Sequence, residues 1–369
     1  MPEAVINGKR VSFEPEMTIL EAAARAGITI PTLCYHPALE TFGGCRICLV
    51  EAKGFSKLLP ACTTPISEGM EITTESPLIR DTRRAIVELM LLRHPFECLY
   101  CHANGRCELQ RLVYNLGIKR DSFPGRADRS PTPHPVDESN QFFIRDTDKC
   151  VLCGRCVRVC ESHAQYSAID FLNRGIKTVI QRPADFGIES SDCKFCGQCV
   201  AVCPVGALAE RPALGGGLAA DIKRVKTVCP YCGVGCSVVV EINRQGRVTN
   251  VTTDHTDTDS LNQGRSCVKG RFGWEFVNSP DRLTTPLIKE NGEFRAASWD
   301  EALDTVAAGL RRNMGRAGFF TSARCTNEEN YLMQRFAREV MSTNNVDHCA
   351  TSDTPLRWRV SARPSEAAR

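Results

Sequence analysis

The spacing of the cysteines is the feature that most constrains how this chain can fold. Of its 21 cysteines, 19 fall in five tight groups, and only Cys325 and Cys349 stand alone. In a reducing cytoplasm, cysteines grouped in this way are more often metal ligands or catalytic thiols than disulfides. We therefore expect several small domains that contain groups of thiol ligands.

The composition is that of an ordinary globular protein. Hydrophobic residues make up 42% of the chain, charged residues make up 24%, and the formal net charge is +3. These values exclude collagen-like, mucin-like and wholly disordered classes and indicate no preference for nucleic acid. The sequence has no run of about 18 apolar residues and no apolar signal core at its N-terminus. It therefore predicts a cytoplasmic chain without a transmembrane segment.

Local patterns near the N-terminus predict a hairpin and a helix. Asn7 and Gly8 lie between two short alternating runs, and this pair favours a type I′ turn because both central residues of that turn need a positive φ. Thr18 and Glu21 have the spacing of a capping box, and Gly27 supplies a helix stop. A hairpin, a helix and a cysteine-rich loop indicate a small α+β domain.

Farther along the chain, the patterns predict helices and a strand between linkers. Residues 79–93 have a helical period, and residues 298–312 form an amphipathic helix capped by Ser298. A buried strand is expected from Gly318, followed by a helix over 327–340, as at the start of an α/β domain. Proline and glycine place linkers at 124–135 and 215–217.

The first cysteine group is Cys34, Cys45, Cys48 and Cys62, and it includes the glycine-rich stretch GGCRIC. It resembles the ligand set of plant-type 2Fe-2S ferredoxins, in which four thiolates bind two irons and glycine lets the backbone approach the sulfides. This resemblance implies a β-grasp domain. The alternative is a zinc site, but zinc ribbons usually pair two C-x2-C units, and only Cys45 and Cys48 are paired in this way.

The second group, Cys98, Cys101 and Cys107, lacks one thiolate for a 4Fe-4S cluster. Its segment HPFECLYCHANGRC resembles the motif of one histidine and three cysteines in the large iron-sulfur subunit of respiratory complex I and in related hydrogenases. In that motif the histidine precedes a proline, so the resemblance implies His94 as the fourth ligand. The other histidines near these groups are interpreted as ordinary surface residues: His36, His102 and His163.

The third and fourth groups form a duplicated C-x2-C-x2-C-x3-C run between residues 150 and 203. It resembles bacterial two-cluster ferredoxins, in which the fourth cysteine of each run binds the other cluster. The resemblance implies one ligand set of Cys150, Cys153, Cys156 and Cys203 and another of Cys160, Cys193, Cys196 and Cys199. Two zinc sites are the alternative. The complex I subunit keeps only one of these clusters and resembles this region less well.

The fifth group is Cys229, Cys232, Cys236 and Cys267. With the stretches CPYCGVGC and SCVKGRFG, it resembles the N-terminal 4Fe-4S domain of molybdopterin-dependent oxidoreductases. The resemblance implies that Lys269 lies between the cluster and the pterin, where its positive charge would stabilise added negative charge. A solvated surface lysine is the alternative.

The stretch SARCTNEENY and the helix before it resemble the opening of the bis-pterin fold of metal-dependent formate dehydrogenases. The modules follow the order found in the alpha subunit of cytoplasmic formate dehydrogenases. The resemblance implies one 2Fe-2S cluster, four 4Fe-4S clusters and, in the intact protein, a bis-molybdopterin guanine dinucleotide with molybdenum or tungsten. It also implies formate as substrate and a flavin- and NAD-binding iron-sulfur subunit as partner. No nucleic-acid partner is expected.

The alternative function is a separate iron-sulfur electron-transfer subunit, similar to the large iron-sulfur subunit of complex I or to a hydrogenase partner. Iron-only hydrogenases share the first three modules, but no cysteine pattern for their catalytic cluster follows residue 230. The metal-binding cysteine or selenocysteine of formate dehydrogenases, and the histidine after it, do not occur before Arg369. We therefore expect a truncated chain that does not oxidise formate alone.

The C-terminal tail is expected to be a frameshifted reading. After the stretch VDHC the resemblance to formate dehydrogenases stops. Reading each codon from the third base of the preceding one permits their run PSVAGLGATFGSGAM at positions 356–370, provided that a TGA stop follows Arg369. The same shift excludes cysteine at position 353 and allows TGA, a selenocysteine codon in such genes, followed by histidine. A genuine truncated electron carrier with an unrelated tail is the alternative.

The expected fold class is an α+β multidomain protein. Its expected parts are a 2Fe-2S ferredoxin-like domain (1–78), a histidine-ligated 4Fe-4S domain (79–123), a linker (124–139), a two-cluster 4Fe-4S ferredoxin domain (140–212), a linker (213–223), a 4Fe-4S domain of molybdopterin oxidoreductases (224–280), the truncated start of an α/β molybdopterin-binding domain (281–350) and an atypical tail (351–369). Cys325 and Cys349 belong to no ligand set and are interpreted as packed thiols.

Overall fold

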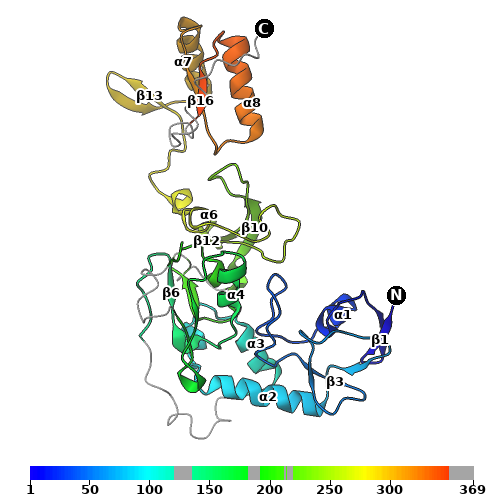
Figure 1. The fold of residues 1–369 in the computed structure, drawn as a ribbon. Coiled ribbons are helices and arrows are strands. Elements are labelled where there is room, and N and C mark those ends of the chain that lie inside the picture. Colours follow the sequence, from blue (N-terminus) through cyan, green and yellow to red (C-terminus); the bar gives the residue numbers. More distant parts are fainter. Residues whose placement is uncertain (120–134, 182–191, 212, 214–218, 349–369) are drawn as a thin grey trace. The chain divides into compact units, whose positions relative to one another are not determined.

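The structure is a computed structural model that describes residues 1–119, 135–181, 192–211, 213 and 219–348 (Figure 1). The chain forms two compact units, one of residues 1–227 and 238–274 and the other of residues 228–237 and 275–369. Several sequence predictions fall outside the described residues. These are Cys349, the atypical tail at 351–369, the glycine linker at 215–217 and most of the linker at 124–139.

The N-terminal residues form a five-stranded sheet and one helix. The elements are β1 (Glu3–Ile6), β2 (Lys9–Ser12), α1 (Ile19–Arg25), β3 (Leu49–Ala52), β4 (Leu59–Pro60) and β5 (Glu71–Thr73). The strand order is β2-β1-β5-β3-β4, with β1 parallel to β5. Asn7 and Gly8 have φ of 51° and 79°, and both bonds of the Thr18–Glu21 capping box are present. The expected hairpin and helix start are therefore confirmed.

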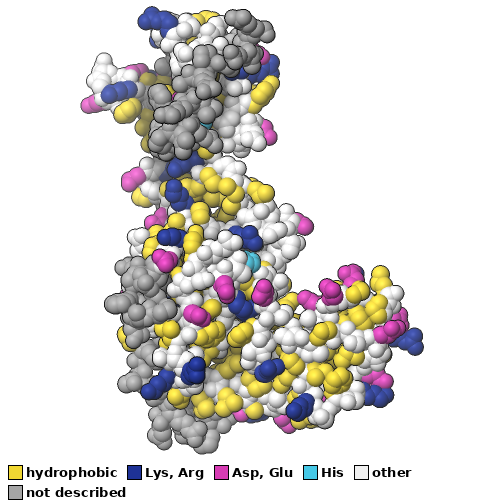
Figure 2. Space-filling model, in the orientation of Figure 1, with side chains coloured by type: hydrophobic (Ala, Val, Ile, Leu, Met, Phe, Trp, Pro, Cys, Tyr) yellow, Lys and Arg dark blue, Asp and Glu magenta, His cyan; other side chains and the backbone are white. Residues whose placement is uncertain are grey.

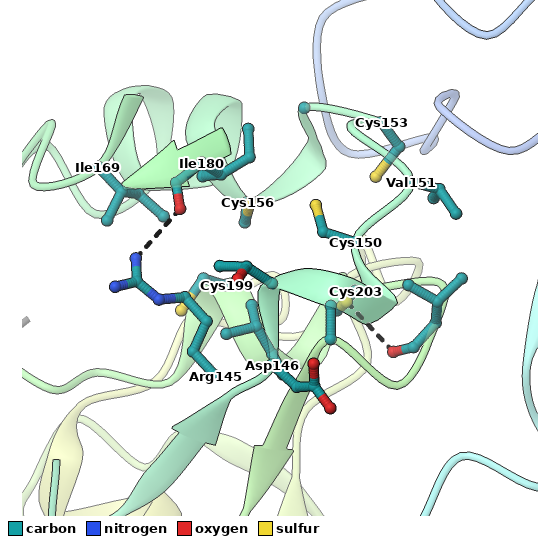
Figure 3. A pocket seen from close by; sticks show the side chains of 15 residues that line it. Arg145, Asp146, Cys150, Val151, Cys153, Cys156, Ile169, Ile180, Cys199 and Cys203 are labelled. Carbon is teal, nitrogen blue, oxygen red and sulfur yellow. Dashed lines mark hydrogen bonds between the residues drawn. The ribbon is translucent and has the colours of Figure 1, made fainter. Parts of the chain in front are cut away.

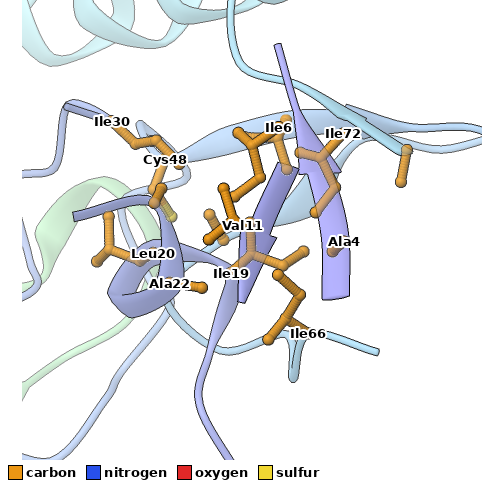
Figure 4. Close-up of a cluster of buried hydrophobic side chains, with 14 of the residues drawn as sticks. Ala4, Ile6, Val11, Ile19, Leu20, Ala22, Ile30, Cys48, Ile66 and Ile72 are labelled. Carbon is orange, nitrogen blue, oxygen red and sulfur yellow. The ribbon is translucent and has the colours of Figure 1, made fainter. Parts of the chain in front are cut away.

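Apolar side chains from α1 and the sheet form the core of this region (Figure 4). Ile6 and Ile19 are fully buried, and Leu20 packs beside them. Cys48 belongs to the same cluster and is 1% exposed. The core therefore anchors one end of the cysteine-rich loop away from water.

Two helices and a short 3-10 turn follow the sheet: α2 (Pro77–Leu91), η1 (Cys98–Tyr100) and α3 (Glu108–Asn115). The helix predicted over 79–93 is confirmed, and Ser76 caps it by accepting a hydrogen bond from the Ile79 N–H. Apolar side chains of α2 and α3, including Val87 and Leu109, pack in one cluster with Val205. This packing joins the second cysteine group to the end of the duplicated motif.

The two copies of the duplicated motif pack against each other. The elements are β6 (Phe143–Arg145), η3 (Thr147–Lys149), α4 (Arg155–Ser162), β7 (Asp170–Leu172), η4 (Gly175–Lys177), β8 (Val179–Gln181), α5 (Gln198–Ala201) and β9 (Leu208–Glu210). Gly154 and Gly197 precede α4 and α5 with nearly equal φ of 70° and 71°. Val159 and Val202, which occupy equivalent positions in the two copies, pack in one cluster. The two copies therefore share a local backbone.

The last part of the first unit is built around a three-stranded sheet in the order β10-β11-β12. The elements are η6 (Ala219–Asp221), β10 (Lys223–Val228), β11 (Ser237–Ile242), β12 (Val248–Thr252) and α6 (Val268–Phe272). Phe272 of α6 packs in the same apolar cluster as Phe143 and Leu208. This packing fixes α6 against the duplicated motif.

The second unit contains a hairpin followed by a strand-helix-strand arrangement. The elements are η7 (Glu275–Asn278), β13 (Leu287–Glu290), β14 (Glu293–Ala296), α7 (Trp299–Arg312), β15 (Phe319–Thr321), α8 (Asn327–Arg335), the π-helical turn η8 (Phe336–Val340) and β16 (Val346–His348). The cap at Ser298 is confirmed. The strand predicted after Gly318 forms and pairs in parallel with β16, but its predicted burial is wrong. Phe320 is 78% exposed, because a sheet of two described strands has little to cover it.

The surface carries a mixture of side-chain types. On the face shown in Figure 2, Lys and Arg side chains are interspersed with Asp and Glu, and hydrophobic side chains lie between them. Among the helices of the described ranges, none combines the length and the apolar character needed to cross a lipid bilayer.

Candidate iron-sulfur sites

The four thiols of the first group lie within hydrogen-bonding reach of one another. Hydrogen bonds from the thiols of Cys45 and Cys62 lower the pKa of Cys34 to about 2. The neighbouring Cys62 thiol also lowers the pKa of Cys48 to about 7, while its own pKa rises. The backbone N–H of Cys34 donates to Sγ of Cys45 at 3.4 Å. The loop therefore gathers four cysteine thiols in one place, as a 2Fe-2S cluster would require.

The second group surrounds η1 and the start of α3. Cys107 is the N-cap of α3, and its Sγ accepts a hydrogen bond from the Gln110 N–H at 3.4 Å. Burial raises the pKa of both Cys98 and Cys107. A Cβ at Gly206 would overlap Sγ of Cys101. This thiol therefore lies directly against the loop that follows the duplicated motif.

Two histidines are close to the second group in sequence, and their surroundings differ. His94 lies just beyond the end of α2 and is 9% exposed. The ring of His102 is half-buried, and its Nε2 lies 3.2 Å from the carbonyl oxygen of Leu208. The imidazole of His102 thus has a structural partner within the protein.

Three cysteines of the third group and two of the fourth line one cavity (Figure 3). They are Cys150, Cys153, Cys156, Cys199 and Cys203, whereas Cys160 does not line it. Burial raises the pKa of Cys156 well above its ordinary value, and the next causes are the charges of Cys153, Cys150 and Cys203. The structure therefore brings together the four thiols expected from the crossed arrangement.

The other half of the duplicated motif shows the same pattern. Burial raises the pKa of Cys199, and the thiols that act most strongly on it are Cys196, Cys193 and Cys160. The Ala168 N–H donates to Sγ of Cys160 at 3.3 Å. Such N–H donors help to set the potential of a bound cluster.

A matching pair of backbone donors occurs at the first cysteine of each copy. The Leu152 N–H donates to Sγ of Cys150 and the Phe195 N–H donates to Sγ of Cys193, both at 3.4 Å. Leu152 and Phe195 both have positive φ, at 53° and 55°. An L-residue rarely adopts this conformation. Both copies of the motif therefore use the same strained turn, which directs a backbone N–H at the sulfur of the first cysteine.

The buried thiols of the duplicated motif do not ionise by themselves near neutral pH. Burial raises the pKa of Cys150 and Cys203 to about 11 and that of Cys153 to about 12, so these groups would stay protonated near neutral pH unless a cation replaced the proton. Among the described residues, no three Cys, His, Asp or Glu side chains are placed to hold a single metal ion. A 4Fe-4S cluster makes a different demand, because each of its four ligands binds a different iron.

The fifth group is divided between the two units. Cys229, Cys232 and Cys236 belong to the second unit, where the Cys229 N–H donates to the Cys236 carbonyl at 2.8 Å. Cys267 belongs to the first unit, is exposed and immediately precedes α6, without a capping hydrogen bond from its side chain. Lys269 lies in α6 and is also exposed.

Arginines beside the cysteine loops were missed by the sequence analysis. Arg158 of α4 donates to the Cys34 carbonyl at 2.5 Å and also to the Glu40 carbonyl. Its guanidinium lies 5.4 Å from the centroid of the Phe42 ring. Arg158 therefore fastens the loop of the first cysteine group to the duplicated motif. Arg158 is the last residue of the stretch CGRCVR. Its contact with the Cys34 carbonyl could not be read from the sequence and is seen only in the fold.

Three histidines from different modules form a cluster that the sequence did not indicate. The ring centroid of His255 lies 5.8 Å from that of His36 and 5.9 Å from that of His163. Burial is the main cause that lowers the pKa of His255 to about 3 and of His36 to about 4, so both rings are neutral at pH 7. The interpretation of His36, His102 and His163 as surface residues is wrong, because all three are half-buried between modules.

Family models match five stretches of the chain. They describe a 2Fe-2S iron-sulfur cluster binding domain (3–77), an NADH-ubiquinone oxidoreductase-G iron-sulfur binding region (83–121), a 4Fe-4S dicluster domain (149–207), a molybdopterin oxidoreductase Fe4S4 domain (222–279) and a molybdopterin oxidoreductase domain (282–362). The kinds of module expected from the motifs are therefore confirmed.

Curated relatives cover nearly all of this chain. The alpha subunit of an NADPH-Fe(3+) oxidoreductase from Geobacter sulfurreducens is 37% identical over 94% of this chain and 40% of its own length. An NADH-quinone oxidoreductase subunit from Rhizobium meliloti is 36% identical over 96% of this chain and 41% of its own length. The Bacillus subtilis protein YrhE, named provisionally as a formate dehydrogenase, is 34% identical over 94% of this chain and 39% of its own length. The chain thus spans about 40% of the length of these relatives.

A solved structure resembles part of the chain. One chain of an NAD⁺-reducing nickel–iron hydrogenase in the H2-reduced state matches with a TM-score of 0.52 and 30% identity. The match covers 57% of this chain and 87% of the hydrogenase chain.

Proposed function

We propose that this chain is an iron-sulfur module that carries electrons between a bis-pterin molybdenum or tungsten centre in the whole protein and a flavin- and NAD-binding partner subunit. Its matches to models of molybdopterin oxidoreductase domains support this role. The proposed reaction at the metal is the oxidation of formate to carbon dioxide. The stretch SARCTNEENY at 322–331 and the similarity to YrhE support formate as the substrate. Lys269 is proposed to lie beside the pterin.

The observation that carries this proposal is the crossed grouping of thiols in the duplicated motif. Cys203 lines the same cavity as Cys150, Cys153 and Cys156, and so does Cys199, while Cys160 does not line it. Crossed ligation is typical of two-cluster ferredoxins, which transfer electrons. When bound, each cluster accepts one electron at a time.

The proposed ligand sets use every cysteine of the five groups. A 2Fe-2S cluster is held by the first group, and four 4Fe-4S clusters are held by the second group with His94, by the two crossed sets and by the fifth group. The protein's own contribution is to exclude water from the buried thiols and to direct backbone N–H groups at their sulfur atoms.

We expect anaerobically reconstituted protein to hold about 18 irons per chain, because five complete ligand sets accommodate one 2Fe-2S and four 4Fe-4S clusters. Zinc should be minor. Iron and zinc analysis by mass spectrometry, with acid-labile sulfide in parallel, measures this directly. About half of that iron content, or zinc in stoichiometric amount, would contradict the proposed ligand sets.

Replacing His94 by alanine is expected to alter or remove one 4Fe-4S signal and to leave the 2Fe-2S signal unchanged, because His94 supplies the ligand missing from the three-cysteine group. Low-temperature EPR of the reduced protein measures both signals. His102→Ala is the matched control, since the His102 ring contacts the Leu208 carbonyl. If His102→Ala removes the signal and His94→Ala does not, the proposed ligand is wrong.

A second candidate is an electron-transfer subunit of an NADH-quinone oxidoreductase or hydrogenase type. The Rhizobium relative and the hydrogenase structure favour it. The two candidates differ in the electron donor. Formate-dependent reduction of a viologen dye by the whole purified protein supports the first, whereas reduction of the clusters by NADH through a flavin subunit, without any formate activity, supports the second.

A further inference from the structure

Arg271 is a buried cation that crosses from α6 to the second copy of the duplicated motif. It is 2% exposed and belongs to the largest fully buried side chains among the described residues. A Cβ at Gly197 would overlap Cδ of Arg271 and lie 2.5 Å from its Nε. Only glycine at position 197 therefore lets the guanidinium lie over the loop between Cys196 and Cys199.

The hydrogen bonds of Arg271 are incomplete within the described protein. Its Nη2 donates to the carboxylate of Glu210, which is also buried, and to Oγ1 of Thr252 at 3.4 Å. Its Nε and Nη1 have no acceptor in the described part of the chain, and both are shielded from solvent. Leaving charged donors unpaired away from water is costly. These two nitrogens therefore indicate an acceptor that the described protein residues do not supply.

The two copies of the motif obtain their arginine in different ways. In the first copy Arg155 follows Gly154, is 4% exposed and binds Glu108 through two hydrogen bonds of 2.7 and 2.8 Å. The second copy has Gln198 at the equivalent position, and this residue contacts His255 and the Ser266 carbonyl instead.

Arg271 therefore occupies in the second copy the role that Arg155 has in the first. A buried arginine paired with a glutamate therefore lies beside each copy of the motif. The positive charge of Arg271 lowers the pKa of the Cys196 and Cys199 thiols. Burial raises the pKa of both thiols and is the larger effect. The charge of Arg155 likewise lowers the pKa of the Cys153 thiol.

We propose that Arg271 is a positioning residue that raises the reduction potential of the 4Fe-4S cluster held by Cys160, Cys193, Cys196 and Cys199, and that Glu210 limits this effect. One-electron reduction adds one negative charge to the cluster, so a nearby buried cation stabilises the reduced form more than the oxidised form. Its Nε and Nη1 can donate hydrogen bonds to cluster sulfur, which acts in the same direction. The inference rests on the ligand sets under the proposed function.

The test is an EPR-monitored redox titration of the reconstituted full chain and of two variants. Arg271→Gln should shift the equilibrium of one 4Fe-4S cluster about tenfold toward the oxidised form at a fixed potential, which corresponds to a midpoint lowered by about 59 mV. Glu210→Gln should shift the same cluster in the opposite direction, because the charge of Arg271 is then no longer offset. A general structural disturbance does not produce shifts of opposite sign.

Two further variants make the assignment specific. Arg271→Lys keeps the charge and should show a smaller shift than Arg271→Gln. Arg155→Gln is the matched control and should shift a different 4Fe-4S cluster, because Arg155 lies beside Cys153. If the Arg271→Gln variant does not retain the cluster, the Glu210→Gln titration alone tests the proposal. A raised midpoint for this cluster then supports it.

Two outcomes overturn the inference. The first is that Glu210→Gln leaves every midpoint unchanged. The second is that the Arg271 and Glu210 variants shift the same cluster in the same direction. Failure of the ligand sets is distinguished by the unmodified protein, which would then hold far fewer than about 18 irons.

Discussion

Replacing Cys203 by alanine is expected to remove the same 4Fe-4S cluster as replacing Cys153, although the two cysteines belong to different copies of the motif. Both thiols line the cavity of Figure 3, and a cube that loses one of its four thiolates is not held. Iron content should fall from about 18 to about 14 per chain in either variant. Low-temperature EPR of the reduced variants should show the same signal missing.

The complementary pair and a neutral variant complete this test. Cys160→Ala and Cys193→Ala should share the loss of the other cluster. Cys325→Ala, which removes a thiol outside every proposed set, should keep the full iron content. If Cys203→Ala and Cys193→Ala lose the same signal instead, each copy of the motif holds its own cluster and the crossed arrangement is refuted.

Arg83→Met is expected to destabilise the N-terminal sheet by about 3–5 kcal/mol. Arg83 is 2% exposed and donates from α2 to the carbonyls of Ile47, Leu49 and Thr74 at 2.9, 3.0 and 3.1 Å. Methionine fills a similar space but leaves these buried acceptors without donors. Ile47 lies between Cys45 and Cys48, so the variant should also weaken retention of the 2Fe-2S cluster.

Hydrogen exchange measures this effect without requiring the whole chain to unfold in one step. Amide protection in β3 and β5 should fall by about 100- to 3,000-fold in Arg83→Met. The neighbouring Arg84 is the control, because its side chain is 42% exposed and pairs with Glu88 on the same helix. Arg84→Met should cost less than about 0.5 kcal/mol. Equal losses in the two variants would contradict the proposed role of Arg83.

Local structure and ligand grouping could be predicted from the sequence because their signals are local. The Asn7–Gly8 turn and the Thr18 capping box depend on residues within a few positions of each other. The spacing of the cysteines is similarly compact within each group, apart from Cys267. The crossed grouping was anticipated only through the resemblance to two-cluster ferredoxins.

Contacts between modules could not be predicted, since they join residues that are far apart in sequence. Arg158 and the Cys34 carbonyl are 124 positions apart, and Arg271 and Glu210 are 61 apart. The burial of β15 was overestimated for a related reason. A hydrophobic run such as GFFTSA indicates a strand, but its burial depends on neighbours that the run itself does not specify.

The interleaving of the two motif copies has a consequence for how the protein is synthesised. With the crossed ligand sets, Cys150, Cys153 and Cys156 remain incomplete until Cys203 has been translated, roughly 50 residues later. At synthesis rates of about 5–20 residues per second this interval lasts roughly 2–10 s. Of the two clusters of this motif, the one whose ligands begin earlier in the chain is thus completed later. Its last ligand, Cys203, follows Cys199, which completes the set that contains Cys160. Nascent chains should therefore carry exposed, oxygen-sensitive thiols during this interval, and cluster insertion into the pair should follow translation of the whole motif.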